Sequence, residues 1–180
     1  MRSERFFLSC LIVSVCCRMT SLWAQSVPNP SFEIGEVVPD GWHLSGGEGG
    51  VTDDAAEGSR AVYVTGVPHS QSSNAWYTNP MVFEPGRVYR LSFQAKRVGG
   101  SGGSPVSGPA FCNRDLYEVT SEWKRYFSYF MAPASPLDSR LRFGQWEADG
   151  VIAFDDIALV PVEPVYRRRG LIKLGDAENI

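Results

Sequence analysis

The chain has 180 residues, which is room for one domain of ordinary size. It is 43% hydrophobic and 12% aromatic, so it has enough apolar material for a core and is not a disordered chain. The net charge of −3 gives no basic field that would attract nucleic acid, and we therefore exclude nucleic acid as a partner.

The first 24 residues have the pattern of a secretory signal peptide. Arg2 and Arg5 precede an apolar run over residues 6–17, which is too short to span a bilayer as a helix. We expect cleavage near Ala24 and a secreted, periplasmic or cell-surface protein; a membrane anchor and a lipoprotein are the alternatives. Three of the four cysteines would leave with this segment, so Cys112 would have no partner for an internal disulfide.

Short strands separated by glycine and proline turns follow, which is the pattern of an all-β protein. Residues 61–65 are β-branched and flanked by glycines. Residues 80–83 precede a Glu-Pro-Gly turn, and residues 88–97 alternate cleanly after it, which predicts a hairpin. In the second strand Leu91, Phe93 and Ala95 would face the core, and the other face would carry Ser92, Gln94 and Lys96.

Glycine-rich residues 99–109 are expected to form a mobile loop within the domain. Further strands are predicted within residues 123–131, 137–146 and 151–160. Two packed antiparallel sheets, a β-sandwich of the jelly-roll type, account for this number of strands. We expect the sandwich to span residues 25–162. Residues 163–180 would be a short tail or a linker that leads into a further region. The strand pattern at residues 171–175 has no expected partner strand.

Six short motifs occur in order: Asn-Pro-Ser-Phe-Glu at 29–33, Pro-Asp-Gly-Trp at 39–42, Glu-Gly-Ser at 57–59, Glu-Pro-Gly-Arg at 84–87, Glu-Trp at 122–123 and Phe-Asp-Asp-Ile at 154–157. Together, over residues 26–162, they resemble the carbohydrate-binding modules of the family 4, 9 and 22 group. The resemblance implies a galactose-binding-like jelly roll and a non-catalytic module that binds a polysaccharide or oligosaccharide. We expect the module to be monomeric, although the sequence does not determine the oligomeric state. It does not identify the sugar.

Asp155 shares a strand face with Ala153, Ile157 and Leu159, so its carboxylate should point into an apolar interior. An unpaired charge there costs several kcal/mol or more. Arginine, backbone N–H groups or a hard cation could compensate it. The resemblance favours a structural Ca²⁺, whose ligands would be Asn29, Glu33, Gly58, Ser59 and Asp155. Asp156 is expected to face solvent.

Carbohydrate recognition needs aromatic faces that stack on sugar rings and planar polar groups that bind hydroxyls. In the resembling modules, the outer face of one sheet forms the binding cleft. We therefore expect the sugar-binding residues to be Trp76, Tyr77, Gln94, Lys96, Arg142 and Trp146. The alternative is that Trp76 or Trp146 covers the edge of the core. Trp42 and Trp123 are expected in the core, and the pattern does not assign a face to Phe127 or Tyr129.

The sequence contains no nucleophile elbow, metal-binding histidine pair or phosphate-binding loop. We therefore expect no catalytic residues. Two other functions remain open: a structural or adhesion module of the same fold, and the leading piece of a glycoside hydrolase.

Overall fold

The computed structural model describes residues 26–66, 74–101, 104–112, 114, 118–146, 149–166 and 172–174. These ranges contain strands, turns and bends and no helix. The expected signal peptide at residues 1–24 lies outside them. The strands are β1 (Trp42–Ser45), β2 (Gly49–Thr52), β3 (Ala61–Thr65), β4 (Asn74–Thr78), β5 (Val88–Ser101), β6 (Ser104–Pro109), β7 (Lys124–Met131), β8 (Leu141–Trp146), β9 (Asp149–Val162), β10 (Pro164–Tyr166) and β11 (Ile172–Leu174).

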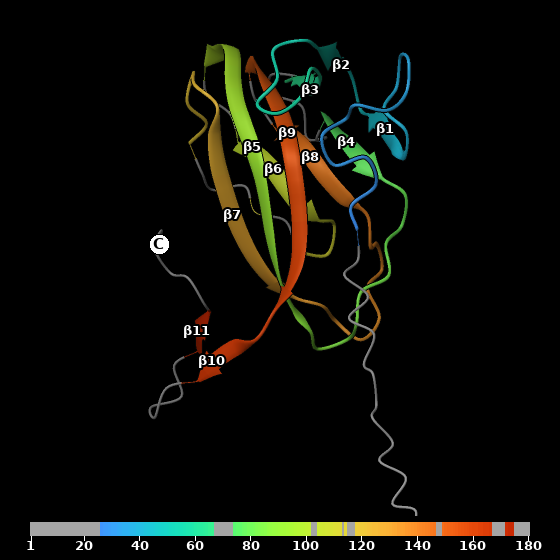
Figure 1. The fold of residues 1–180 in the computed structure, drawn as a ribbon, viewed down its shortest axis with the longest axis vertical. Helices are drawn as coiled ribbons and strands as arrows, with labels where there is room; N and C mark the ends of the chain where they lie inside the picture. The colour runs from blue at the N-terminus through green and yellow to red at the C-terminus, as the bar shows by residue number, and fades with distance from the viewer. Residues whose placement is uncertain are drawn as a thin grey trace, which may run out of the picture.

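Two antiparallel sheets pack face to face, which confirms the predicted sandwich (Figure 1). The four-stranded sheet has the order β1-β4-β8-β6, and the five-stranded sheet has the order β2-β3-β9-β5-β7. The long strands β5 and β9 lie side by side and form the centre of the larger sheet (Figure 1). A separate two-stranded sheet, β10-β11, projects beyond the end of β9 (Figure 1).

Alternation along each strand fills the core between the sheets. Leu91, Phe93 and Ala95 are buried as predicted, with at most 1% exposure. The Phe143 ring lies 5.1 Å from that of Phe93 and 5.9 Å from that of Trp42, so one aromatic cluster joins the two sheets. Burial of each such side chain contributes about 1.5–3 kcal/mol, which lets a sandwich without an internal disulfide rely on its core.

A β-bulge interrupts β9 next to its buried aspartate. Ser92 pairs with Ala158 and Gln94 pairs with Asp155, so two residues of β9 oppose the single Phe93. Asp156 takes up the extra length with a φ of 47°. The bulge reverses the alternation: Ile157 faces the core, while Asp155 lies on the outer face. The prediction that Asp155 shares a face with Ile157 was therefore wrong.

Three further local predictions were wrong. Residues 80–83 form no strand, because β5 pairs with β7 and β9 instead of forming a hairpin with them. Within residues 99–109, expected to be a loop, β5 continues to residue 101 and β6 pairs with β8. Residues 172–174, within the segment expected to lack a partner, pair with β10.

Candidate functional site

One row of polar and aromatic side chains crosses the outer face of the four-stranded sheet. His43 pairs with Tyr77, and Tyr77 pairs with Arg142, so the three residues occupy neighbouring positions on β1, β4 and β8. Their neighbours along the strands, Trp42 and Phe143 among them, face the core. Because strand side chains alternate, the row His43-Tyr77-Arg142 must face outward.

Tyr77 is held at the centre of this row. The His43 ring is nearly parallel to it, with centroids 5.7 Å apart and an angle of 17°. On the side of β8, the Arg140 guanidinium lies 4.7 Å from the Tyr77 centroid. Asp138 fixes Arg140 through Nε–Oδ1 and Nη2–Oδ2 contacts of 2.9 and 2.5 Å. Because neighbours flank Tyr77 on both sides, its hydroxyl and ring edge are the parts presented outward.

Trp146 extends this surface along β8. It lies four residues after Arg142 and therefore on the same side of the strand, and it is 40% exposed. It is the only tryptophan among the exposed large hydrophobic residues of the described part of the chain. We call the surface formed by His43, Tyr77, Arg140, Arg142 and Trp146 the Tyr77 face.

Asp138, which lies next to this surface, holds the Arg140 side chain in place. The pKa of Asp138 is lowered, chiefly by its hydrogen bonds from the Arg140 side chain, and the pKa of Arg140 is raised by the same contact. Both groups therefore stay charged over the physiological pH range, and the guanidinium stays in place over Tyr77.

The structure brings three of the six predicted sugar-binding residues together and separates the others. Tyr77, Arg142 and Trp146 lie on the Tyr77 face. Gln94 and Lys96 lie on the outer face of the five-stranded sheet, on the opposite side of the sandwich. Lys96 donates a hydrogen bond to Asp54 at 2.6 Å. These two residues cannot bind the same sugar unit as Tyr77.

Trp76 belongs to the core, so its placement among the sugar-binding residues was wrong. It is 2% exposed, and its Nε1 donates a hydrogen bond to the Tyr63 carbonyl oxygen at 2.9 Å. Of the adjacent pair Trp76 and Tyr77, only the second can face outward, because β4 is a regular strand.

Trp123 was predicted in the core and lies instead at the surface. It is partly exposed and precedes β7, and its Nε1 donates to Asp54 Oδ1 at 3.0 Å. Lys96 and Trp123 together lower the pKa of Asp54, with the Lys96 contact the larger cause. Trp42, the other predicted core tryptophan, is 4% exposed, as expected.

The two residues without a predicted face also lie away from the Tyr77 face. Tyr129 pairs with Arg90 and Phe127 pairs with Ser92, which puts both on the outer face of the five-stranded sheet. The Arg90 guanidinium lies 5.8 Å from the Phe127 ring centroid.

Sequence reasoning did not select His43 or Arg140. The signal was present for both: His43 follows a core tryptophan, and Arg140 has the same parity as Arg142. Neither residue can be assigned to the surface around Tyr77 without the strand order, which places β1 and β8 on either side of β4.

The two carboxylates expected to bind calcium hold one loop, residues 53–60. Asp155 Oδ2 accepts hydrogen bonds from the backbone N–H groups of Ala56 and Glu57, both at 2.8 Å, and Oδ1 accepts one from Asp156 at 2.7 Å. Burial raises the pKa of Asp155 to about 6, although these N–H groups act in the opposite direction.

Glu33 holds the C-terminal part of the same loop. Its Oε1 accepts from the N–H groups of Ser59 and Arg60, both at 2.9 Å, and its Oε2 accepts from Ser59 Oγ at 2.8 Å. The backbone N–H of Ser59 is the main cause of its lowered pKa. Gly58 has φ +70°, and a Cβ there would lie 2.4 Å from Glu33 Oε1.

The hydrogen bonds from backbone N–H groups compensate the buried carboxylate of Asp155, which is one of the alternatives that the sequence left open. Asn29 uses its side chain locally, in two contacts with the backbone of Ile34. Each carboxylate already accepts three hydrogen bonds, which leaves one lone pair on each for a cation. No group of three or more His, Cys, Asp or Glu side chains in the described ranges could hold a metal ion. Calcium binding stays a prediction.

Comparisons with known proteins support the fold. No family model matches the sequence, and a search of curated proteins found no match. Among solved structures, the enzymatically active domain of bacteriophage CBA120 tailspike protein 4 is similar with a TM-score of 0.56 and 18% identity, over 79% of this chain and 22% of that one. The C-terminal family 22 carbohydrate-binding module of Clostridium thermocellum Xyn10B matches with a TM-score of 0.54 and 17% identity, over 77% of this chain and 94% of that one.

A cyclase from Fischerella sp. TAU is equally similar, with a TM-score of 0.54 and 17% identity over 79% of this chain and 98% of that one. The chain therefore has the jelly-roll sandwich fold of carbohydrate-binding modules, as its sequence motifs implied. At these identities the likeness concerns the fold, and proteins with different activities share it. No helix in the described part of the chain is long and apolar enough to cross a membrane.

Proposed function

We propose that the protein is a carbohydrate-binding module that holds a polysaccharide on the Tyr77 face. The observation that carries the proposal is the combination on one outward face of an exposed tryptophan with a fixed row of hydrogen-bonding side chains. Aromatic and planar polar groups together supply both affinity and orientation for sugars.

The parts of the Tyr77 face would have different roles. Trp146, at 40% exposure, is the side chain on which the apolar face of a sugar ring would stack. The flanked Tyr77 would offer its hydroxyl instead of its ring face. Arg142 and His43, on either side of it, would donate hydrogen bonds to sugar hydroxyls. Arg140, already fixed by Asp138, would position Tyr77.

Calorimetric titration against soluble β-glucans, xylans and mannans tests this proposal. Stacking on one face of an indole buries about half of its surface, so Trp146→Ala should weaken binding by on the order of 1–3 kcal/mol. Trp123→Ala is the matched control, because it removes a partly exposed indole from the opposite side of the molecule. Equal affinity of the Trp146→Ala variant and the wild type would place the sugar elsewhere.

The role we propose is non-catalytic. Among the residues that the structure describes, the Tyr77 face has arginine, histidine and aromatic groups, and the carboxylate beside it, Asp138, is engaged by Arg140. Glycoside hydrolysis requires two carboxyl groups across the scissile bond. One similar structure joins a family 22 module to a GH10 module, which keeps open the alternative that this chain accompanies a glycoside hydrolase.

Export and calcium binding complete the proposal. The charged and apolar pattern of residues 1–24 supports secretion with cleavage near Ala24. Glu33 and Asp155, which both hold residues 53–60, would be the carboxylate ligands of a calcium ion. Asn29, Gly58 and Ser59 are the other ligands that the sequence predicts. When bound, Ca²⁺ would strengthen the attachment of residues 53–60 to the sandwich and would take no part in sugar chemistry.

A further inference from the structure

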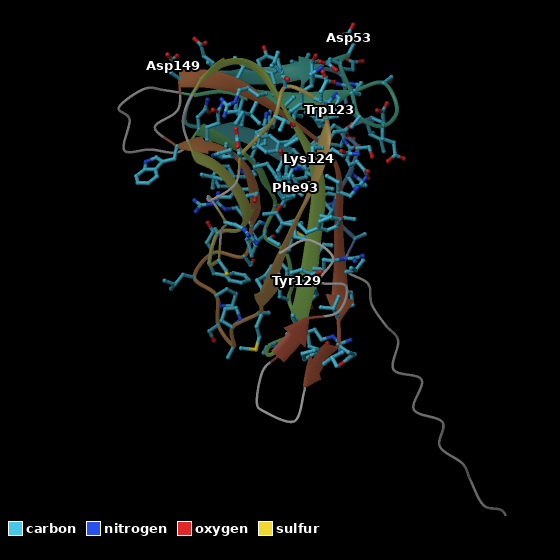
Figure 2. The ribbon with its side chains drawn as sticks, turned by 90° about the vertical axis from the view of Figure 1, so that its left-hand side faces the viewer. Asp53, Phe93, Trp123, Lys124, Tyr129 and Asp149 are labelled. Atoms are coloured by element: carbon cyan, nitrogen blue, oxygen red, sulfur yellow. The ribbon has the colours of Figure 1, made fainter. Side chains whose placement is uncertain are left out.

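The open edge of the sandwich contains a pocket of about 250 Å³, away from the Tyr77 face. It lies where β7, the last strand of the five-stranded sheet, faces β6, the last strand of the other sheet. Figure 2 views the molecule from this side and shows Lys124 and Phe93 close together, with Tyr129 farther along. The volume is below the roughly 300–1,000 Å³ of sites for drug-sized ligands, so it suits a single small unit.

The mouth of this pocket is cationic. Arg114, Lys124 and Arg125 line it, and no described lining residue is acidic. Arg125 forms an ion pair with Asp156. Arg114 and Lys124 form no ion pair with a described carboxylate, and both are exposed. Two like charges at one small opening repel each other, so a bound anion would lower their electrostatic energy.

The backbone fixes the position of Arg114. Its N–H donates to the Ser107 carbonyl oxygen at 2.7 Å, and its own carbonyl oxygen accepts from the Ser107 N–H at 2.9 Å. Ser107 is fully buried on β6. Arg114 is thus attached to the edge of the four-stranded sheet, while Lys124 belongs to the edge of the other sheet. The two cations approach the pocket from opposite walls.

Aromatic rings also line the pocket. The Tyr126 ring stacks on that of Phe93, with centroids 5.8 Å apart and an angle of 21°. The Tyr126 hydroxyl donates to the Glu118 carbonyl oxygen at 2.8 Å, which holds the ring in place. Lys124 Nζ lies 6.0 Å from its centroid. Because Phe93 and Lys124 both lie against the Tyr126 ring, the edge of this ring is the part that a ligand can contact. The pocket therefore combines a fixed aromatic edge with positive charge, and both suit a ligand that has an apolar ring and an anionic group.

We propose that this pocket binds one carboxylate-bearing sugar unit, a uronic acid residue of an acidic glycan. The sugar ring would contact the edge of the Tyr126 ring, and the carboxylate of the sugar would accept hydrogen bonds from Arg114 and Lys124. This site is separate from the Tyr77 face and does not require that face to bind sugar. A neutral sugar of the same size would gain only the ring contact.

The test is a titration of the full protein with oligogalacturonate and with the matching neutral galacto-oligosaccharide, followed by NMR shifts of backbone amides. We expect shifts at residues 124–127 and 107 with the acidic ligand and none there with the neutral one. Arg114→Gln and Lys124→Gln should each weaken acidic binding about tenfold or more, the loss expected for one charge-assisted hydrogen bond. Both residues are exposed, so the variants should keep the wild-type melting temperature.

Three controls make the result decisive. Arg87→Gln removes an arginine paired with exposed Glu163 and should leave the affinity unchanged. Trp146→Ala should also leave it unchanged, which separates failure of this pocket from failure of the Tyr77 face. Inorganic phosphate should bind more weakly than the oligogalacturonate. Equal binding of neutral and acidic sugars, equal binding of phosphate, or loss of acidic binding in Trp146→Ala would each overturn the proposal.

Discussion

The burial of the Asp155 carboxyl, which holds residues 53–60, can be tested by the pH dependence of stability. The Asp155 carboxyl is fully buried, and burial raises its pKa from 3.8 to about 6 in the metal-free protein. The folded state therefore binds a proton more tightly than the unfolded state. The stabilisation that comes from this tighter proton binding by Asp155 is fully present below pH 3.8 and is lost as the pH rises through about 6.

The size of this effect follows from the two pKa values. A difference of about 2 between folded and unfolded states corresponds to on the order of 3 kcal/mol. Other carboxyl groups titrate in the same range, so the comparison needs a variant that lacks only this one. Asp155→Asn keeps the shape of the side chain and an oxygen acceptor for the loop, and it cannot titrate.

Urea unfolding of both proteins in chelator, between pH 4 and pH 7, isolates the contribution. We expect the free energy of unfolding of the wild type, relative to that of Asp155→Asn, to fall by a few kcal/mol across this interval, of the order set by the pKa difference. Parallel curves would show that the carboxyl does not titrate near pH 6 and would refute the argument from burial. Repeating the measurement at pH 7 with Ca²⁺ tests the metal proposal, because bound calcium should raise the stability of the wild type alone.

Three other predictions concern the tryptophans and the loop. Trp76→Ala should destabilise the fold by about 3–5 kcal/mol in urea unfolding, because it leaves a cavity in the core; a loss below about 1 kcal/mol would contradict its burial. Trp146→Ala should change stability by less than about 0.5 kcal/mol, and a larger loss would indicate a role in the core. Asp54→Ala should shift the fluorescence of Trp123, which loses its hydrogen bond, and cost less than about 1 kcal/mol because the site is partly exposed; an unchanged spectrum would argue against the contact.

The sequence predicted the fold class because the strongest strands alternate clearly. The pattern from Leu91 to Ala95 identified the core face of β5, and β9 and β7 were recognised by their apolar and aromatic residues. The segment that contains β6 was missed because Gly and Pro have low strand propensity. There the pairing with β8 decides the structure.

The candidate site could be predicted only in part, because alternation gives the two faces of a strand but not the sheet to which the strand belongs. Tyr77 and Gln94 were both read as outward, and both predictions of facing hold, yet they lie on opposite sides of the molecule. Asp155 shows a second limit of sequence reasoning. A single extra residue at Asp156 changes which residues of β9 face the core after that point, and the local sequence does not predict a bulge there.

The place of β9 in the larger sheet has a consequence for how the domain is made. This strand is the last of the sandwich to be synthesised, yet it lies between β3 and β5. Before the ribosome has released residue 162, β2-β3 and β5-β7 are two hairpin-like fragments with unpaired inner edges. Pairing across nearly a hundred residues, from Val62 to Phe154, then has to close the sheet in one late step. The larger sheet of the nascent domain therefore cannot be completed before β9 has been made.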